Sequence, residues 1–205
     1  MSNINLKSYS NIDEAVAFEL AFVPLIYTYD SIAPMEYDKY LCSRCRNYEQ
    51  SRDYLCPKRN FKKDYGLLCS IQRFAVSIEI RNELIELFDV EENDFRPVRN
   101  KEGEILAYQI TPIHTMLPIS DVNRIKKLKP CSKCGAVQYR INEYKNEKGE
   151  EFCYISKEAL EDMHDINKTF ERFDMFIPRY IVSRRVYEYM VQKNPRMRFK
   201  PYFLK

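Results

Sequence analysis

The stretch Cys131-Ser132-Lys133-Cys134-Gly135 decides the fold, because it presents two thiolates at the C-x-x-C spacing of a zinc knuckle. In a knuckle, a tight turn points both sulfurs at one ion. The glycine after the second cysteine allows the left-handed backbone that this turn needs. A closed tetrahedral zinc site has four ligands, so the stretch predicts two more ligands elsewhere in the chain.

The stretch Cys42-Ser43-Arg44-Cys45 repeats both the cysteine spacing and the serine at the second position. We therefore predict one structural zinc site shared by the two knuckles, with the ligands Cys42, Cys45, Cys131 and Cys134. Four thiolates leave no open position for water or substrate. A contiguous zinc ribbon separates its knuckles by about 15–20 residues, whereas 85 residues lie between Cys45 and Cys131. The shared site is thus a prediction about the fold, in which one ion joins the start of the chain to its middle.

Two alternatives to the shared site remain open at this point. One is a pair of local sites, formed by Cys42, Cys45, Cys56 and Cys69 and by Cys131, Cys134, Cys153 and His164. The other is a chain without metal. A redox C-x-x-C motif would open a helix beside a βαβ core, and neither knuckle has that context.

An internal repeat organises the rest of the chain. Arg73-Phe74-Ala75-Val76-Ser77 recurs as Arg179-Tyr180-Ile181-Val182-Ser183, and Phe95-Arg96-Pro97-Val98 recurs as Phe199-Lys200-Pro201-Tyr202. In each copy a β-prone stretch ends at a serine, a good helix N-cap. An amphipathic helical segment and a short Phe-x-Pro strand follow.

These patterns predict an α/β (α+β) protein with two related strand-helix-strand halves, each preceded by a C-x-x-C knuckle. The first half covers residues 1–118 with its repeat copy at 72–98, and the second covers residues 119–205 with its copy at 178–204. We expect the zinc clamp to join both halves into one domain.

Local patterns predict further elements. A capping box at Ser10 predicts a helix over residues 14–20, and residues 22–29 read as an extended stretch. Residues 122–128 favour a short helix. Residues 137–143 and 151–155 favour a hairpin, and Ser156 is a candidate cap for a helix over 157–163.

Composition and motifs narrow the class of protein. Seven cysteines without a secretory signal favour a reducing cytoplasm. No apolar run approaches the ~20 residues that span a bilayer, so we expect no membrane association. The chain holds no G-x-G-x-x-G, P-loop or H-E-x-x-H motif and has only two histidines. We therefore predict no catalytic residues and a protein that is not an enzyme.

Charge is distributed unevenly along the chain. Residues 1–120 carry 14 Lys/Arg and 18 Asp/Glu, whereas residues 121–205 carry 19 and 12. Three hypotheses follow. The acidic first copy binds a basic protein partner, the basic and aromatic segment 179–205 binds nucleic acid, or the two copies face one another. The candidate binding residues are Glu79, Glu83, Glu86, Arg184 and Arg185.

With both knuckles and both copies in view, the chain resembles the double-CXXCG motif family and related immunity proteins of bacterial polymorphic toxin systems. The matching residues are Cys42, Cys45, Cys131, Cys134 and Gly135, with the end segment from Ile181 to Pro201. Arg46 stands where the first motif has its glycine. The resemblance implies a cytoplasmic, non-enzymatic bacterial protein that binds and neutralises a cognate toxin.

Overall fold

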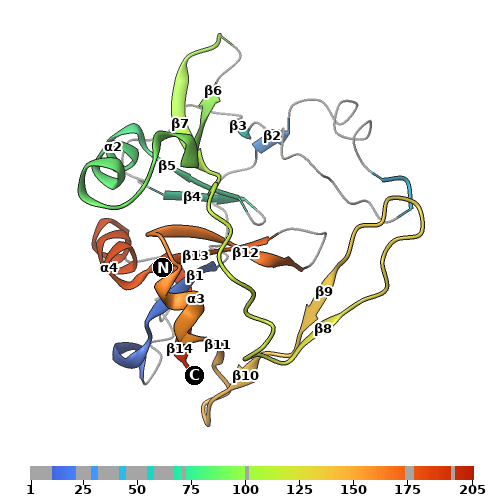
Figure 1. Ribbon diagram of the computed structural model, residues 1–205. Helices are drawn as coiled ribbons and strands as arrows, with labels where there is room; N and C mark the ends of the chain where they lie inside the picture. Colours follow the sequence, from blue (N-terminus) through green and yellow to red (C-terminus); the bar gives the residue numbers. More distant parts are fainter. Residues whose placement is uncertain are drawn as a thin grey trace.

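The computed structural model describes residues 11–21, 29–31, 42–44, 55–57, 67–70, 73–99, 102–173, 178–194 and 197–205. This part of the chain is mixed α+β, mostly strand, with few helices (Figure 1). The helical elements are η1 (Ile12–Glu14), α2 (Ile78–Leu87), η2 (Glu92–Asp94), α3 (Lys157–Glu161) and α4 (Arg184–Lys193).

The larger sheet has six strands in the order β10-β11-β14-β1-β13-β12. Their bounds are β10 (Tyr144–Lys145), β11 (Glu151–Ile155), β14 (Arg198–Leu204), β1 (Ala17–Ala21), β13 (Pro178–Ser183) and β12 (Ile166–Arg172). β1 lies between β14 and β13 and is antiparallel to both, whereas β11 is parallel to β14. The early residues of the chain thus complete a sheet built mostly from its last third.

The smaller sheet has the order β4-β5-β7-β6, with bounds β4 (Leu67–Ser70), β5 (Arg73–Val76), β7 (Ile105–Ile110) and β6 (Phe95–Arg99). Two ribbons accompany the sheets. One joins β2 (Tyr29–Ser31) to β3 (Leu55–Pro57), and the other joins β8 (Ile125–Lys127) to β9 (Tyr139–Ile141).

Four neighbouring strands of each sheet have the same order and antiparallel directions: β4-β5-β7-β6 in one and β12-β13-β1-β14 in the other. The registers agree as well, since Pro97 is opposite Tyr108 and Pro201 is opposite Phe18. In both sheets a helix leaves the second of these strands. β1 therefore fills the place in the larger sheet that β7 fills in the smaller one.

Two serines start the long helices in the same way. The hydroxyl of Ser77 accepts a hydrogen bond from the Ile80 N–H, and that of Ser183 accepts one from the Val186 N–H. Their backbone angles agree within a few degrees, at φ −63°, ψ 163° and φ −64°, ψ 162°. The expected N-caps are confirmed, because the signal is local to each serine.

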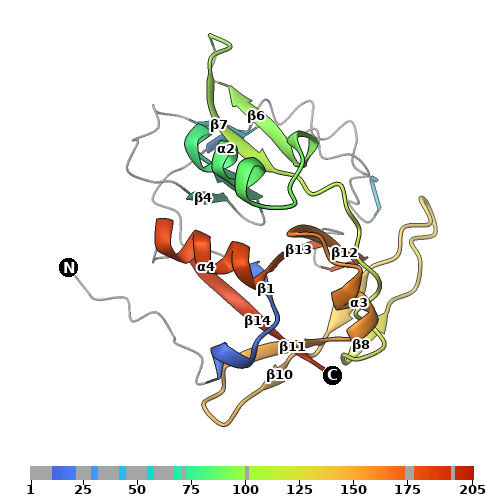
Figure 2. The same ribbon diagram turned by 60° about the vertical axis from the view of Figure 1, so that its left-hand side comes forward.

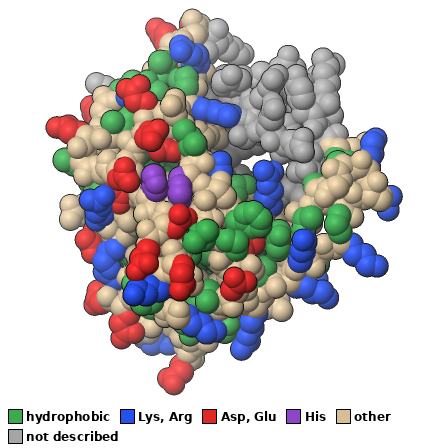
Figure 3. Space-filling model, in the orientation of Figure 1, with side chains coloured by type: hydrophobic (Ala, Val, Ile, Leu, Met, Phe, Trp, Pro, Cys, Tyr) green, Lys and Arg blue, Asp and Glu red, His purple; other side chains and the backbone are tan. Residues whose placement is uncertain are grey.

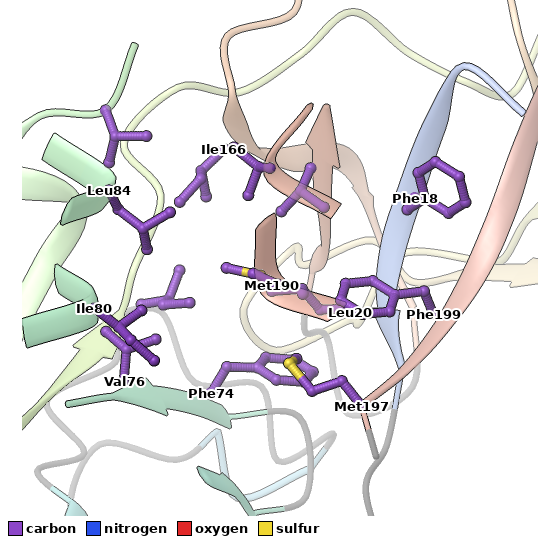
Figure 4. Packing of buried hydrophobic residues seen from close by; sticks show 14 of the residues in the cluster. Phe18, Leu20, Phe74, Val76, Ile80, Leu84, Ile166, Met190, Met197 and Phe199 are labelled. Carbon is purple, nitrogen blue, oxygen red and sulfur yellow. The ribbon is translucent and has the colours of Figure 1, made fainter. Parts of the chain in front are cut away.

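The two long helices lie next to each other, each on its own sheet (Figures 1 and 2). One hydrophobic cluster runs across both, and Figure 4 shows its side chains converging from the two sides. Leu84 of α2 and Met190 of α4 are fully buried in it. Because burial of a Leu or Met side chain contributes about 1.5–3 kcal/mol, this shared core holds the two sheets together.

A second cluster covers the opposite face of the larger sheet. Ala17, Ile181 and Tyr202 belong to it and are fully buried. Loop residues Met116 and Ile119 close it from outside, together with Ala159 of α3. The larger sheet is therefore buried on both faces, which explains why its central strands alternate little between apolar and polar.

Two local predictions are wrong, and a third is wrong in part. A helix over residues 14–20 is absent, because η1 ends at Glu14 and residues 17–21 pair on both sides as β1. A helix over 122–128 is also absent, because Ile125–Lys127 pairs with Tyr139–Ile141. The strand expected at 151–155 is confirmed as β11. Its hairpin partner is β10 and not residues 137–143, and β14 lies on its other side.

One local prediction, the Ser156 cap, is confirmed, and another falls almost wholly outside the described residues. Ser156 caps α3 as expected, accepting from the Ala159 N–H. The expected extended stretch at 22–29 falls almost wholly outside the described residues. In the described part of the chain, no helix has both the length and the apolar character of a membrane span.

Candidate metal centre

Three cysteine thiols meet at the site that the two knuckles predict. The sulfurs of Cys42, Cys131 and Cys134 all lie within 4.8 Å of one another. Cys42 and Cys131 are half-buried and Cys134 is exposed. Among the described residues, this is the group of three or more ligand side chains that could hold a metal ion. Cys45 lies outside the described residues.

The sulfur spacing fits a zinc ion. Zn–S bonds of about 2.3 Å in a tetrahedral site place neighbouring sulfurs roughly 3.8 Å apart. The Sγ atoms of Cys42 and Cys131 are 3.9 Å apart, well beyond the ~2.05 Å of a disulfide. These two residues are 89 positions apart in the sequence. Thiols from such distant segments lie here at metal-ligand spacing, so the three-cysteine group can bind a metal.

The backbone turns tightly after Cys131, and Gly135 takes the left-handed conformation that its sequence position predicts. Gly135 has φ +73°, the left-handed region that glycine adopts without strain. Its N–H donates to the Cys131 carbonyl at 2.8 Å, and the Cys131 N–H donates to the Ala136 carbonyl at 2.9 Å. Across the site, the Lys133 ammonium donates to the Ser43 hydroxyl at 2.6 Å. The two segments are therefore joined by a hydrogen bond as well as by the thiol cluster.

The second knuckle sits at the end of an extended arm, which we define as residues 122–142. It consists of β8, the turn with Cys131 and Cys134, and β9 (Figure 1). Backbone hydrogen bonds continue the β8–β9 ladder beyond both ends of the strands, from Leu128 to Gln138 and from Asn142 to Arg124. The arm thus holds the knuckle away from the larger sheet.

Asn123 fixes one end of the arm. Its buried amide donates to the carbonyls of Ile119 and Tyr154 and accepts from the Tyr154 N–H, at 2.7–2.8 Å. Since Tyr154 lies in β11, these bonds tie the arm to the larger sheet.

Glu143 fixes the other end of the arm through a buried charge network. It accepts from Arg179 at 2.9 Å and from the Lys200 ammonium, and Arg179 also pairs with Glu19 at 2.8 Å. The side chains of Glu19, Glu143, Arg179 and Lys200 are each only 12–15% exposed. Tyr202 donates to Glu19 at 3.2 Å. Every charge here has a partner, so the network anchors the arm.

The network shifts the pKa values of its members. Burial opposes ionisation of Glu143, but the Glu151 hydrogen bond and the Lys200 and Arg179 charges outweigh it and lower its pKa to about 2. Hydrogen bonding to Glu143 and burial raise the pKa of Glu151. Burial, with Glu19 nearby, raises the pKa of Cys153 to about 12. Cys153 is therefore a neutral buried thiol near neutral pH.

The structure does not bring Cys153 or His164 to the metal centre, so the alternative of a second local site is wrong. Cys153 lies in the second hydrophobic cluster. His164 stacks on His114 with ring centroids 4.2 Å apart, and Figure 3 shows the two side by side among carboxylates. Asp162 lies 3.4 Å from His114 and Asp89 lies 3.5 Å from His164. The backbones of Cys56 and Cys69 lie in β3 and β4. Cys42 of the first local site lies with Cys131 and Cys134.

Three of the five candidate binding residues contact other parts of the chain. Glu83 on α2 pairs with Lys193 and accepts from Tyr189 of α4, both at 2.5 Å. Arg184 donates to the carbonyls of Ile12 and Ala15 at 2.6–2.9 Å. Arg185 binds the buried Asp165 carboxylate and covers the Phe88 ring.

The Glu83–Lys193 pair joins α2 to α4 through opposite charges, whereas Arg185 pairs with Asp165, which lies outside segments 72–98 and 178–204. Asp165 stays ionised there, because Arg185, Ser183 and the Asp89 N–H lower its pKa against the effect of burial. Glu79 and Glu86, in contrast, are exposed on α2.

Sequence reasoning missed the charge network and the histidine pair. Their members come from segments far apart in the chain, such as Glu19 and Arg179, which are 160 positions apart. No family model, curated protein or solved structure matches this chain.

Proposed function

We propose that Cys42, Cys131 and Cys134, with Cys45 as the fourth ligand, hold one structural zinc ion in a non-enzymatic cytoplasmic protein. The 3.9 Å sulfur separation between Cys42 and Cys131 carries this proposal, since it matches a shared tetrahedral ion. The ion would join residues 42–45 to the arm. The donor set favours zinc because thiolates prefer soft or borderline cations over Mg²⁺ or Ca²⁺.

The proposal includes an origin by duplication, with a knuckle before each copy. The equal order of four strands in both sheets and the equal geometry of the Ser77 and Ser183 caps support it. In the second unit, β1 from the start of the chain would take the place of the hairpin partner β7. In the first unit this strand follows the other strands in the sequence, whereas in the second unit it would come from far before them.

The protein's role in this proposal is to bind and neutralise a cognate protein toxin in a bacterial cell. The resemblance to double-CXXCG and immunity proteins supports this role. The surface available for it on α2 is the exposed strip of Glu79 and Glu86, with Ile78 and Leu87 43% and 57% exposed beside them. An acidic strip with apolar neighbours suits a basic protein partner.

The test is co-expression with toxin-like proteins encoded next to this chain's own gene. Wild type should restore growth of cells that produce one of them and should co-purify with it. Glu79→Lys with Glu86→Lys should abolish both effects. Glu147→Lys with Glu158→Lys changes the charge equally at other sites and should leave protection intact. If no neighbouring product binds wild type, or if the control pair fails as badly, the proposed role is wrong.

Nucleic-acid binding by the segment 179–205 is the weaker candidate. Arg179, Arg184, Arg185, Lys193 and Lys200 all contact carboxylates or carbonyls of the chain itself. Tyr202 and Phe199 are core residues. These five cations and two rings therefore serve the fold.

A further inference from the structure

The arm defined above concentrates positive charge. Residues 122–142 contain six Lys/Arg and no Asp/Glu. All six of these side chains are exposed: Arg124, Lys126, Lys127, Lys129, Lys133 and Arg140. Such a run on one projecting element gives a strong local potential, although the net charge of the whole chain is only +3.

The two faces of the arm differ. Ile125, Tyr139 and Ile141 pack against the second hydrophobic cluster, so this face is turned towards the protein. Lys126 and Arg140 are direct cross-strand partners and point the other way, because side chains alternate along a strand. The outward face of the ribbon is therefore basic on both strands.

Like charges opposite one another destabilise a strand pair. Among the described residues, no carboxylate forms an ion pair with Lys126, Lys127, Lys129 or Arg140. At the base of the arm, in contrast, Glu143 forms ion pairs with both Arg179 and Lys200. The outer face thus presents cations that are available to an anionic partner.

The arm is held in a form that can present this charge. Asn123 and Glu143 fix its base, and the thiol cluster and the Lys133–Ser43 bond fix its tip. Figure 3 shows blue Lys and Arg side chains along the outer edge of this region. A surface that is already ordered loses little entropy on binding.

We propose that the outer face of the arm binds duplex DNA, with Lys126 and Arg140 contacting phosphates. Duplex DNA carries one phosphate charge per ~1.7 Å of axis, and its major groove admits a two-stranded β-ribbon. The deep, narrow major groove of A-form RNA does not. This inference goes beyond the proposed toxin binding and does not depend on it.

The experiment measures binding of the zinc-loaded full chain to a fluorescent 20-base-pair DNA duplex between 50 and 300 mM salt. With four to five phosphate contacts, log K should fall against log salt with a slope of about −4. Lys126→Gln with Arg140→Gln should reduce the slope by about 2 and weaken binding at 0.1 M salt roughly 60-fold. Both residues are exposed, and thermal melting and zinc content will verify that the variant folds.

Lys148→Gln with Lys157→Gln is the matched control, because it removes two exposed cations outside the arm. The control should bind DNA as wild type does. The proposal is overturned if wild type fails to bind at 50 mM salt, or if the control loses as much affinity as the arm variant. Equal or tighter binding of duplex RNA, or equal competition by poly-glutamate at the same charge, would also overturn it.

Discussion

Removing Cys42 should abolish most of the stability that zinc gives to this protein, because it separates the two segments that the ion joins. In the unfolded chain, bringing Cys42 to Cys131 would close a loop of 89 positions. Loop closure on this scale costs about 4–5 kcal/mol. In the folded chain the same sulfurs are already 3.9 Å apart.

The folded state should therefore bind zinc through the full site, while the unfolded state binds it through one knuckle. The difference in zinc-binding free energy between the folded and unfolded states sets an upper limit of about 4–5 kcal/mol for stabilisation by saturating zinc. For a chain of this size, 1 kcal/mol shifts Tm by roughly 2–4 °C. Wild type should thus melt higher in buffered zinc than in chelator, by at most roughly 9–18 °C.

The assay is a pair of melting curves, with zinc and with chelator, for wild type and two variants. Cys42→Ser keeps the knuckle of Cys131 and Cys134, so its zinc-dependent shift should fall to a few degrees. Cys153→Ala lies in the core away from the site, so it should melt lower in both buffers and keep the full shift. A full shift in Cys42→Ser, or none in wild type, would refute the shared clamp.

The remaining predictions concern the caps and the charge network. Ser77→Ala should lower the free energy of unfolding in urea by about 1 kcal/mol. Ser183→Ala should lower it by about 2 kcal/mol, because Ser183 also donates to the buried Asp165 carboxylate. Equal losses in the two variants would contradict this. Arg179→Met should cost about 3–5 kcal/mol in the same assay, since it leaves buried carboxylates short of a cation; a stable variant would contradict it. Glu143 has a lowered pKa, so the stability it contributes should be present above about pH 4.5 and disappear as the pH falls towards 2. The pKa of Glu151 is raised, so ionisation of this carboxyl destabilises the native state. Glu151→Gln should therefore raise Tm at pH 7 but not at pH 4. Equal Tm shifts at the two pH values would contradict this.

Features that depend on neighbours in sequence could be predicted here. The serine caps and the helices after them are such features, since a cap is decided within four residues. The proximity of Cys42 to Cys131 followed from chemistry, because a two-thiolate knuckle needs further ligands. These predictions required no knowledge of the partner strands.

Features that depend on pairing between distant segments could not be predicted. The sequence predicts a helix over residues 17–20, although Ala17 packs in the second hydrophobic cluster and Phe18 and Leu20 pack in the first. Two strands from the end of the chain decide that alternation. A usable signal was present: Ala17-Phe18-Glu19-Leu20 parallels Ala107-Tyr108-Gln109-Ile110, which takes the same place in the smaller sheet. The charge network was hidden for the same reason, because its members come from several strands.

The central place of β1 has a consequence for biosynthesis. Glu19 leaves the ribosome long before Arg179, which follows it by 160 positions, and both flanking strands come late. Until they arrive, β1 has open hydrogen-bonding edges on both sides, a state that favours aggregation. Completion of the larger sheet must therefore wait until β13 and β14 have left the ribosome, and we expect a nascent chain halted before β13 to need a chaperone.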